Sequence, residues 1–259
     1  MPDLVNLPRA ELERMGVAGE SALDCLRSLA SAGRSVVSEA LGHADGGFYE
    51  WRHYPEGDVY DPETHAQYYY HAHPPAERAH GEHGHFHAFL RPRGMPSGVQ
   101  PLMLPELAIP GAPAQPQGPV LPPARQPNQG EDNDKLSHLV AISMDARGSP
   151  IRLFTTNRWV TGETWYRAED VVRMLDRFAV NTSSPSSMLN RWITAMFTLF
   201  RPQMRALLTA RDAAVMTWRR RHRGKIHVFE DRRLDVASAT AIDIEDQVRQ
   251  LKAALRRAA

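Results

Sequence analysis

The sequence predicts an α+β protein: a mostly antiparallel sheet, preceded by an N-terminal helical pair and followed by C-terminal helices that pack on one of its faces. Three observations predict this class. Residues 64–91 and 136–156 alternate with period two around short turns, as antiparallel hairpins do. Residues 8–42 and 168–257 carry apolar residues mostly at helical spacing. The hydrophobic content of 42% in 259 residues is enough to fill a core.

We expect residues 1–45 to form an N-terminal helical segment and residues 46–259 to form a single α+β domain. A proline-rich insert at about residues 92–130 interrupts that domain. Its eleven prolines lack the backbone N–H that helices and strands use, so we expect an extended connector. Its first half should be better ordered, because it holds apolar residues that can dock on the domain: Leu102, Met103, Leu104, Leu107 and Ile109.

The N-terminal segment is expected to hold two helices, the first starting at Pro8 and ending at Gly16, the second spanning about residues 20–41. Cys25, the only cysteine, cannot form an intramolecular disulfide and fits a small buried hydrophobe. A lone cysteine favours a reducing compartment. No signal peptide or membrane-spanning run is visible, so we expect a cytoplasmic protein with no membrane partner.

Residues 46–65 are expected to form an extended lead-in to the hairpin at residues 64–91, which holds seven of the twelve histidines. If its loop centres near Arg78, His71 lies opposite His85 and Tyr69 lies opposite His87. Side chains two apart on a strand share one face, and directly opposed Cβ atoms are about 5 Å apart. The parity therefore predicts a cluster on one sheet face, formed by His71, His73, His85 and His87.

A second hairpin is expected at residues 136–156, where His138 alternates in step with Val140 and Ile142. A single histidine on an apolar strand is commonly a core residue, but His138 becomes a further metal ligand if it faces the same side as His71. Polar residues near the two hairpins could orient the ligands or contact a substrate: Tyr69, Asp58, Asp61, Asn157, Arg158 and Glu163. A turn for Asp61 and an Arg158–Glu163 ion pair are the structural alternatives.

The rest of the chain is expected to be mostly helical, with helices at about residues 168–178, 189–200, 203–221 and 243–257. A short extended piece should precede the last of these helices. The apolar stripe of that helix needs a partner surface, and either this domain or a second subunit in a homodimer could supply it.

The histidine cluster predicts a divalent transition metal, with zinc or iron favoured, since neutral imidazole suits both ions. Closed structural zinc sites usually use cysteine, so an open site fits better, supporting hydrolytic or oxygen chemistry on an unknown small molecule. Two alternatives stay open. The histidines could form a solvated or stacked aromatic face, or a small-ligand or phosphate-binding module without metal.

A basic run at residues 219–225 is the one nucleic-acid candidate. Acidic residues follow closely, no nucleic-acid motif surrounds it, and the net charge of the chain is only +1. The sequence therefore disfavours nucleic-acid binding, and cations at the end of a helix are the simpler interpretation.

Four runs carry a family resemblance: HYPEGDVYDPETHAQYYYHAH, EHGHFHAFL, HLVAISMDARGSPIRLFTTNRWVTGETWY and NRWITAMFTLFRPQ. They resemble an uncharacterised bacterial family of unknown function, across most of residues 50–240. The resemblance implies no activity. The H-x-H pairs are also similar to those of cupins, but the glycine and glutamate spacing of cupins is missing.

Overall fold

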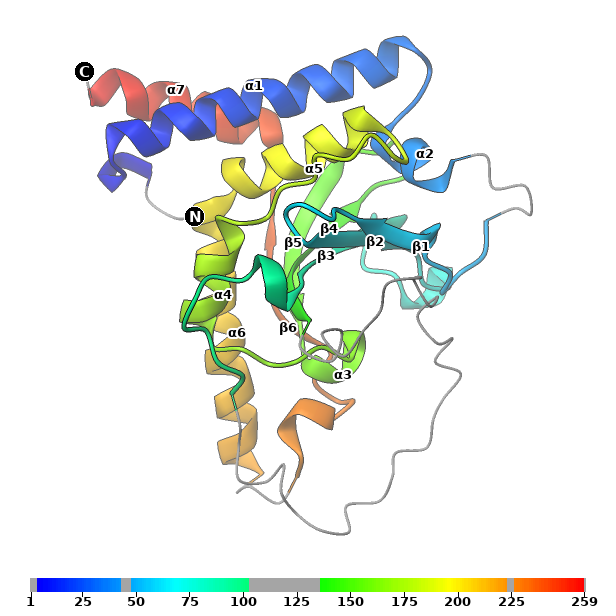
Figure 1. Cartoon of the computed structure of the whole chain (residues 1–259), viewed down its shortest axis with the longest axis vertical. Helices are drawn as coiled ribbons and strands as arrows, with labels where there is room; N and C mark the ends of the chain where they lie inside the picture. The colour runs from blue at the N-terminus through cyan, green and yellow to red at the C-terminus, as the bar shows by residue number, and fades with distance from the viewer. Residues whose placement is uncertain (1–3, 43–47, 103–135, 223–225, 259) are drawn as a thin grey trace.

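The computed structural model describes residues 4–42, 48–102, 136–222 and 226–258 (Figure 1). In these ranges one sheet contains six antiparallel strands, each paired with its neighbour in the chain. The strands are β1 (Tyr54–Tyr60), β2 (Ala66–His71), β3 (Gly84–Leu90), β4 (Ser137–Met144), β5 (Pro150–Thr156) and β6 (Val236–Ala241). The predicted α+β class is confirmed.

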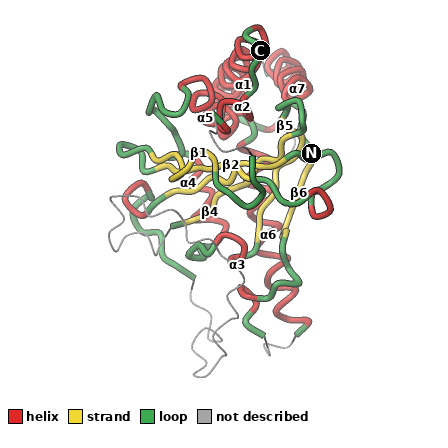
Figure 2. Tube along the Cα trace, turned by 90° about the vertical axis from the view of Figure 1, so that its right-hand side faces the viewer, coloured by secondary structure: helices red, strands yellow, loops and turns green. Residues whose placement is uncertain are grey.

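The α-helices precede and follow most of the sheet. They are α1 (Arg9–Ser31), α2 (Val36–Leu41), α3 (Arg158–Thr161), α4 (Ala168–Leu175), α5 (Ser187–Leu199), α6 (Arg201–Arg221) and α7 (Ile244–Arg257). In Figure 1, β1 and β2 run across the view, whereas β5 and β6 run nearly along its vertical axis, so the sheet is strongly twisted. Figure 2 shows α1, α5 and α7 gathered on one side of the sheet, with α6 beside β6.

The face of the sheet toward the helices is apolar and aromatic. Tyr68 of β2 and Phe86 of β3 are fully buried, and the Phe86 ring lies 5.6 Å from that of Trp192 in α5. The Tyr68 hydroxyl donates a hydrogen bond of 2.5 Å to Asn190 Oδ1, so this buried polar group is satisfied. This packing holds β2 and β3, which carry the histidines on their other face.

The N-terminal helix continues through Gly16, so the predicted break there is wrong. A glycine inside a helix costs only about 1 kcal/mol, which packing of α1 against α5 and α7 readily offsets. Gly19 lets α1 pack closely against its neighbours, since a Cβ at this position would lie 2.6 Å from Val248 Cγ2 and 3.2 Å from Leu199 Cδ1. The chain instead leaves the helix after Ser31, and Ser35 caps α2.

Both predicted hairpins are present, and the lead-in at residues 46–65 contains a strand, β1, that pairs with β2. Helix α3, a single turn, was not predicted. Residues 103–130 of the proline-rich insert lie outside the described residues, and so do the docking candidates Met103, Leu104, Leu107 and Ile109. Leu102 is described, and its backbone N–H donates to the Trp165 carbonyl at 2.8 Å.

Helix α7 packs against α1 of the same chain. Its stripe residues Ile244, Val248 and Leu251 are buried and Leu255 is half-buried, so this chain covers most of the stripe; the homodimer stays a prediction. In the described part of the chain, no helix combines the length and apolar character that crossing a membrane requires.

Candidate metal centre

The sheet face opposite the helices carries the histidines. The register of β2 and β3 pairs Tyr69 with His87 and His71 with His85. This is the register that the alternation predicts for a loop centred near Arg78. As a result, three imidazoles from two adjacent strands project from the same face.

His71, His85 and His87 form a buried triad. One nitrogen from each ring lies within 4.8 Å of the others, close enough to hold a metal ion. The closest pair is His71 Nε2 and His85 Nε2, at 2.7 Å. The ring centroid of His87 lies 5.1 Å from that of His71 and 4.8 Å from that of His85. We call these three residues the histidine triad.

Burial keeps His71 and His87 neutral. It lowers the pKa of His71 and of His87 well below the ordinary value of 6.5, and the neighbouring His85 lowers both further. A metal competes with protons for imidazole nitrogens, so a low pKa leaves these rings ready to bind at neutral pH.

Glu82 orients His85. Its Oε1 lies 2.9 Å from His85 Nδ1, and its Oε2 accepts a 2.5 Å hydrogen bond from Ser143 Oγ. Burial would raise the pKa of Glu82, but the contact with His85, together with Ser143 and Arg152, lowers it overall. A carboxylate on Nδ1 fixes the proton there and leaves Nε2 as the ligand atom, the usual outer-shell arrangement of metal-binding histidines.

A β-bulge brings His138 to the triad. Ala88 pairs with Val140 but Phe89 pairs with His138, so Leu139 is an extra residue in β4. The bulge reverses the side on which His138 projects, away from Val140 and toward His87. His138 Nε2 lies 3.0 Å from His87 Nδ1. His138 thus extends the histidine cluster beyond the triad, through His87 Nδ1.

His73 lies just past the end of β2 and is half-buried. Its ring stacks on Trp51 at 4.3 Å and lies 5.1 Å from the rings of both His71 and His85. It is therefore beside the triad but outside the group whose ligand atoms converge.

Tyr69 and Asp58 meet at His53. The Tyr69 and His53 rings stack at 3.5 Å, and His53 Nδ1 lies 3.0 Å from Asp58 Oδ1. Asp58 also accepts a 2.6 Å hydrogen bond from Gln67. The two predicted residues therefore support the edge of the triad, with the Tyr69 ring 5.4 Å from that of His71.

Asp61 lies in a turn. Its carboxylate accepts hydrogen bonds from the backbone N–H groups of Glu63, Thr64 and Asn181. This is the turn-forming alternative for Asp61, and it joins the sheet to the loop before α5. The structure does not bring Asp61 to the triad's hydrogen-bond network.

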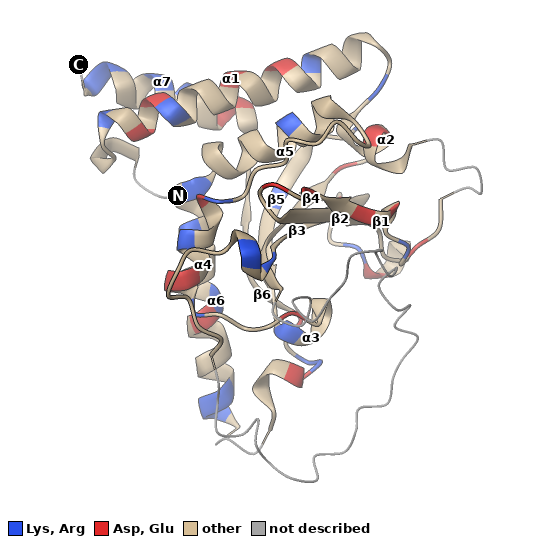
Figure 3. Cartoon of the chain, viewed as in Figure 1, with Lys and Arg blue, Asp and Glu red and all other residues tan. Residues whose placement is uncertain are grey.

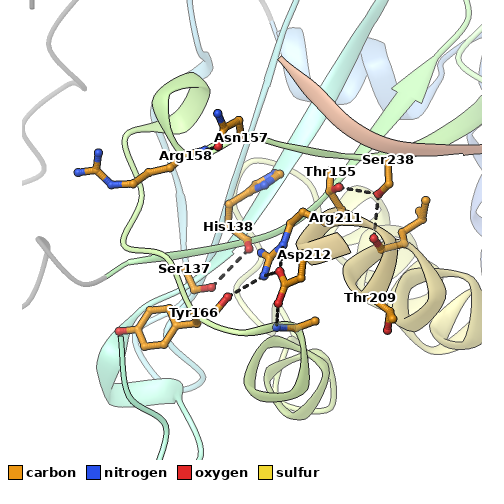
Figure 4. Close-up of polar contacts among 12 residues, drawn as sticks. Ser137, His138, Thr155, Asn157, Arg158, Tyr166, Thr209, Arg211, Asp212 and Ser238 are labelled. Atoms are coloured by element: carbon orange, nitrogen blue, oxygen red, sulfur yellow. Dashed lines mark hydrogen bonds and ion pairs between the residues drawn. The ribbon is translucent and has the colours of Figure 1, made fainter. Parts of the chain in front are cut away.

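Asn157 and Arg158 lie at the start of α3. Asn157 accepts a hydrogen bond from the Arg158 backbone N–H, and its own amide donates to the Val228 carbonyl. The Arg158 guanidinium pairs with Glu230 rather than with Glu163. Figure 4 shows the Arg158 side chain pointing away from His138.

Glu163 is buried behind the triad. Its Oε2 accepts a 2.5 Å hydrogen bond from the His138 backbone N–H, and its Oε1 has no hydrogen-bond partner among the described residues. Burial raises the pKa of Glu163 to about 8, although the buried cation Arg211 opposes the rise. Figure 4 shows how Arg211 is held, by the Tyr166 carbonyl at 2.6 Å and by Asp212 at 2.8 Å.

A cavity of about 200 Å³ opens beside the triad. Its wall includes His73, His85 and His87, together with the charged residues Glu82, Arg78 and Arg152. Two triad members thus face a space in which a small molecule could meet a bound ion.

Residues 16–242 match the model of a protein family described as a domain of unknown function, DUF6969. The chain belongs to this family. Searches of curated proteins and of solved structures found no match. The DUF6969 match spans all six strands, the histidine triad and helices α2 to α6.

Sequence reasoning missed Glu82, the carboxylate partner of the triad. It lies three residues before His85, in the loop of the histidine-rich hairpin, and that closeness was the signal available. The acidic residues selected from the sequence, Asp58 and Asp61, instead lie upstream of β2. The bulge at Leu139 left no comparable signal in the sequence.

The basic run at residues 219–225 ends α6, as the blue segments at the lower end of that helix show (Figure 3). Arg219, Arg220 and Arg221 occupy the last turn, where cations interact favourably with the helix dipole. Arg223 and Lys225 lie outside the described residues.

Replacing Glu82 with glutamine should weaken zinc binding about 10- to 100-fold, the usual effect of losing an outer-shell carboxylate. The amide can still accept a hydrogen bond from His85 Nδ1, but it carries no charge to fix the proton there. Titration of zinc against a competing chelator measures the change. Glu56→Gln, at an exposed position of β1 that does not line the cavity, is the matched control. Equal affinities of Glu82→Gln and the unaltered protein would contradict the role of Glu82.

Proposed function

We propose that this protein binds one divalent transition metal ion through His71, His85 and His87, and that it acts as a metal-dependent enzyme on a small molecule. The observation that carries the proposal is the convergence of three buried imidazoles on adjacent strands. Buried polar groups need partners, and a metal ion would satisfy all three ligand nitrogens at once.

The donor set favours zinc over iron. Non-haem iron oxygenases commonly use two histidines and one carboxylate, whereas catalytic zinc is often held by three protein ligands with a position left open. The triad offers three nitrogens, and Glu82 contacts His85 Nδ1 from outside the group. When bound, zinc supplies Lewis-acid activation of water or of a substrate oxygen, so hydrolytic chemistry is favoured over oxygen chemistry.

The surrounding residues set the proton positions of the ligands. Glu82 keeps the proton of His85 on Nδ1. If His87 carries its proton on Nδ1, it donates to His138 Nε2 at 3.0 Å. His138 Nδ1 then carries the other proton and can donate to the Thr156 hydroxyl at 3.4 Å. These contacts leave Nε2 of His85 and of His87 available to bind a metal ion. Thr156 also lines the cavity.

One observation favours a second candidate, a small-ligand module that holds no metal. His71 Nε2 and His85 Nε2 are at hydrogen-bond distance, so one shared proton could satisfy this pair without an ion. That shared proton does not supply a partner for His87 Nε2, so we rank the metal-free module second.

Elemental analysis of untagged protein tests the proposal. We expect about one equivalent of zinc per chain, retained after gel filtration, because a preformed three-histidine site binds zinc tightly. A histidine tag must be absent, since it would bind metal itself. A transition-metal content below about a tenth of an equivalent, unchanged after incubation with zinc, would sink the proposal and favour the metal-free module.

A further inference from the structure

Two arginines line the cavity beside the histidine triad. Arg152 projects from β5, and Arg78 follows the short helical turn Pro75–Glu77 in the loop between β2 and β3. They come from segments that are far apart in the sequence, and neither belongs to the triad. Only 27% of the Arg152 side chain is exposed, so its charge needs compensation near the cavity.

Arg152 is held in place but incompletely neutralised. Its guanidinium stacks over the Phe154 ring at 4.7 Å, and Nε donates to Ser143 Oγ at 3.3 Å. Its ion pair with Glu82 is long, at 3.4 Å, and Glu82 is already engaged by His85 and Ser143. Arg152 is therefore a rigid cation with donor capacity left for a ligand.

Arg78 is in a similar state. Its Nε donates to the His73 carbonyl at 2.6 Å, which fixes the side chain against the end of β2. In the described part of the chain, its ion pair is with Glu50, at 3.7 Å, beyond hydrogen-bond distance. Only 16% of the Arg78 side chain is exposed, whereas 42% of the Glu50 side chain is. Water screens such a contact, so Glu50 compensates the Arg78 charge weakly.

We propose that this cavity binds a small monocarboxylate, whose carboxylate is held by Arg78 and Arg152 while its other end faces His85 and His87. A guanidinium matches a carboxylate with two parallel hydrogen bonds, and two such groups would clamp it. The proposal deepens the proposed function: it rests on that function for the reaction, but not for the binding of the anion.

The charges of the wall set the ligand class. Three acidic residues, Glu77, Glu82 and Asp235, also line the cavity, and they would repel a dianion such as phosphate more than a single carboxylate. A volume of about 200 Å³ is below that of typical drug-sized pockets, so the ligand is small. The apolar lining from Phe154 and Val160 fits a short carbon chain.

Calorimetry with acetate, propionate and butyrate tests the proposal, with inorganic phosphate as the comparison anion at constant ionic strength. We expect at least one of the carboxylates to bind the zinc-loaded protein more tightly than phosphate does. Arg78→Gln and Arg152→Gln should each weaken that binding about 10- to 100-fold, the effect of losing a charge-assisted hydrogen-bond pair. Arg152→Lys keeps the positive charge but loses the paired N–H donors of the guanidinium. Its carboxylate affinity should lie between those of the unaltered protein and Arg152→Gln.

The matched control is Arg249→Gln, an exposed residue of α7 paired with Asp246, which should not change carboxylate binding. Zinc content is measured on every variant, to separate the two proposals. Protein that takes up no zinc but still binds carboxylate through the arginines would uphold this inference and contradict the metal proposal. Full zinc content with no carboxylate binding up to about 10 mM, or with equal binding in the arginine variants, would overturn this inference alone.

Discussion

His71→Ala is expected to abolish stoichiometric zinc binding while leaving the protein folded. Zinc sites with four protein ligands bind with about 10–16 kcal/mol, or roughly 3–4 kcal/mol per ligand, so the loss of one ligand weakens binding about 100- to 1000-fold. His71 is the best position to test because its hydrogen bond, through Nε2, is to another triad member, His85. Replacing His85 would also leave the buried Glu82 carboxylate without its partner, and so would affect the fold.

Two measurements check this result. Competition with a chelator measures zinc affinity, and thermal unfolding with and without zinc measures how strongly the ion stabilises the folded protein. His80→Ala is the matched control, since His80 is exposed in the same hairpin loop. The triad assignment fails if His71→Ala retains the zinc affinity of His80→Ala, or if zinc stabilises both variants equally.

Glu163→Gln is expected to remove most of the loss of stability that the metal-free protein suffers between pH 6 and pH 9. Burial raises the pKa of Glu163 from 4.5 to about 8 in the folded protein. Folding therefore favours the protonated acid. That contribution is fully present below pH 4.5 and is lost as the pH rises through 8.

The size of the effect follows from linkage. The whole interval from pH 4.5 to 8 corresponds to about 5 kcal/mol, of which about 3 kcal/mol falls above pH 6. The neutral amide introduced by Glu163→Gln has no proton to lose, so the variant should be about 2–3 kcal/mol less sensitive to pH over this range. His73, with a pKa of about 4, and His138, with a pKa of about 3, titrate well below the range from pH 6 to pH 9.

Urea unfolding at several pH values, with a chelator present, measures this dependence. The chelator matters because metal binding has a pH dependence of its own. Glu56→Gln, at an exposed position of β1, is the control and should follow the unaltered protein. Parallel curves for Glu163→Gln and Glu56→Gln would show that another group causes the loss of stability.

The histidine-rich hairpin could be predicted in detail because its determinants are local. Alternation assigns His71, His85 and His87 to one face, in the register expected for a loop centred near Arg78 and also after a slip of two residues; the structure has the first of these registers. The class of the fold follows from the same kind of local pattern, strand periods of two and helix periods of 3.6.

Contacts between distant segments decided what local patterns could not. Helix α1 runs through Gly16 because α5 and α7 pack along it, and β1 becomes a strand because β2 offers it an edge. Propensity at Gly16 favours a break by only about 1 kcal/mol, so the burial of the helix outweighs it.

The sequence alone therefore placed His71, His73, His85 and His87 on one face of a predicted sheet, with helices on the opposite face. The tertiary structure decided the surroundings of those histidines. Glu82 reaches His85, a bulge at Leu139 turns His138 toward His87, and Arg78 and Arg152 meet at one cavity. Side-chain parity repeats every two residues and can be read along a single strand. A bulge or a shared cavity depends on which segments pair in space, and no local spacing encodes that.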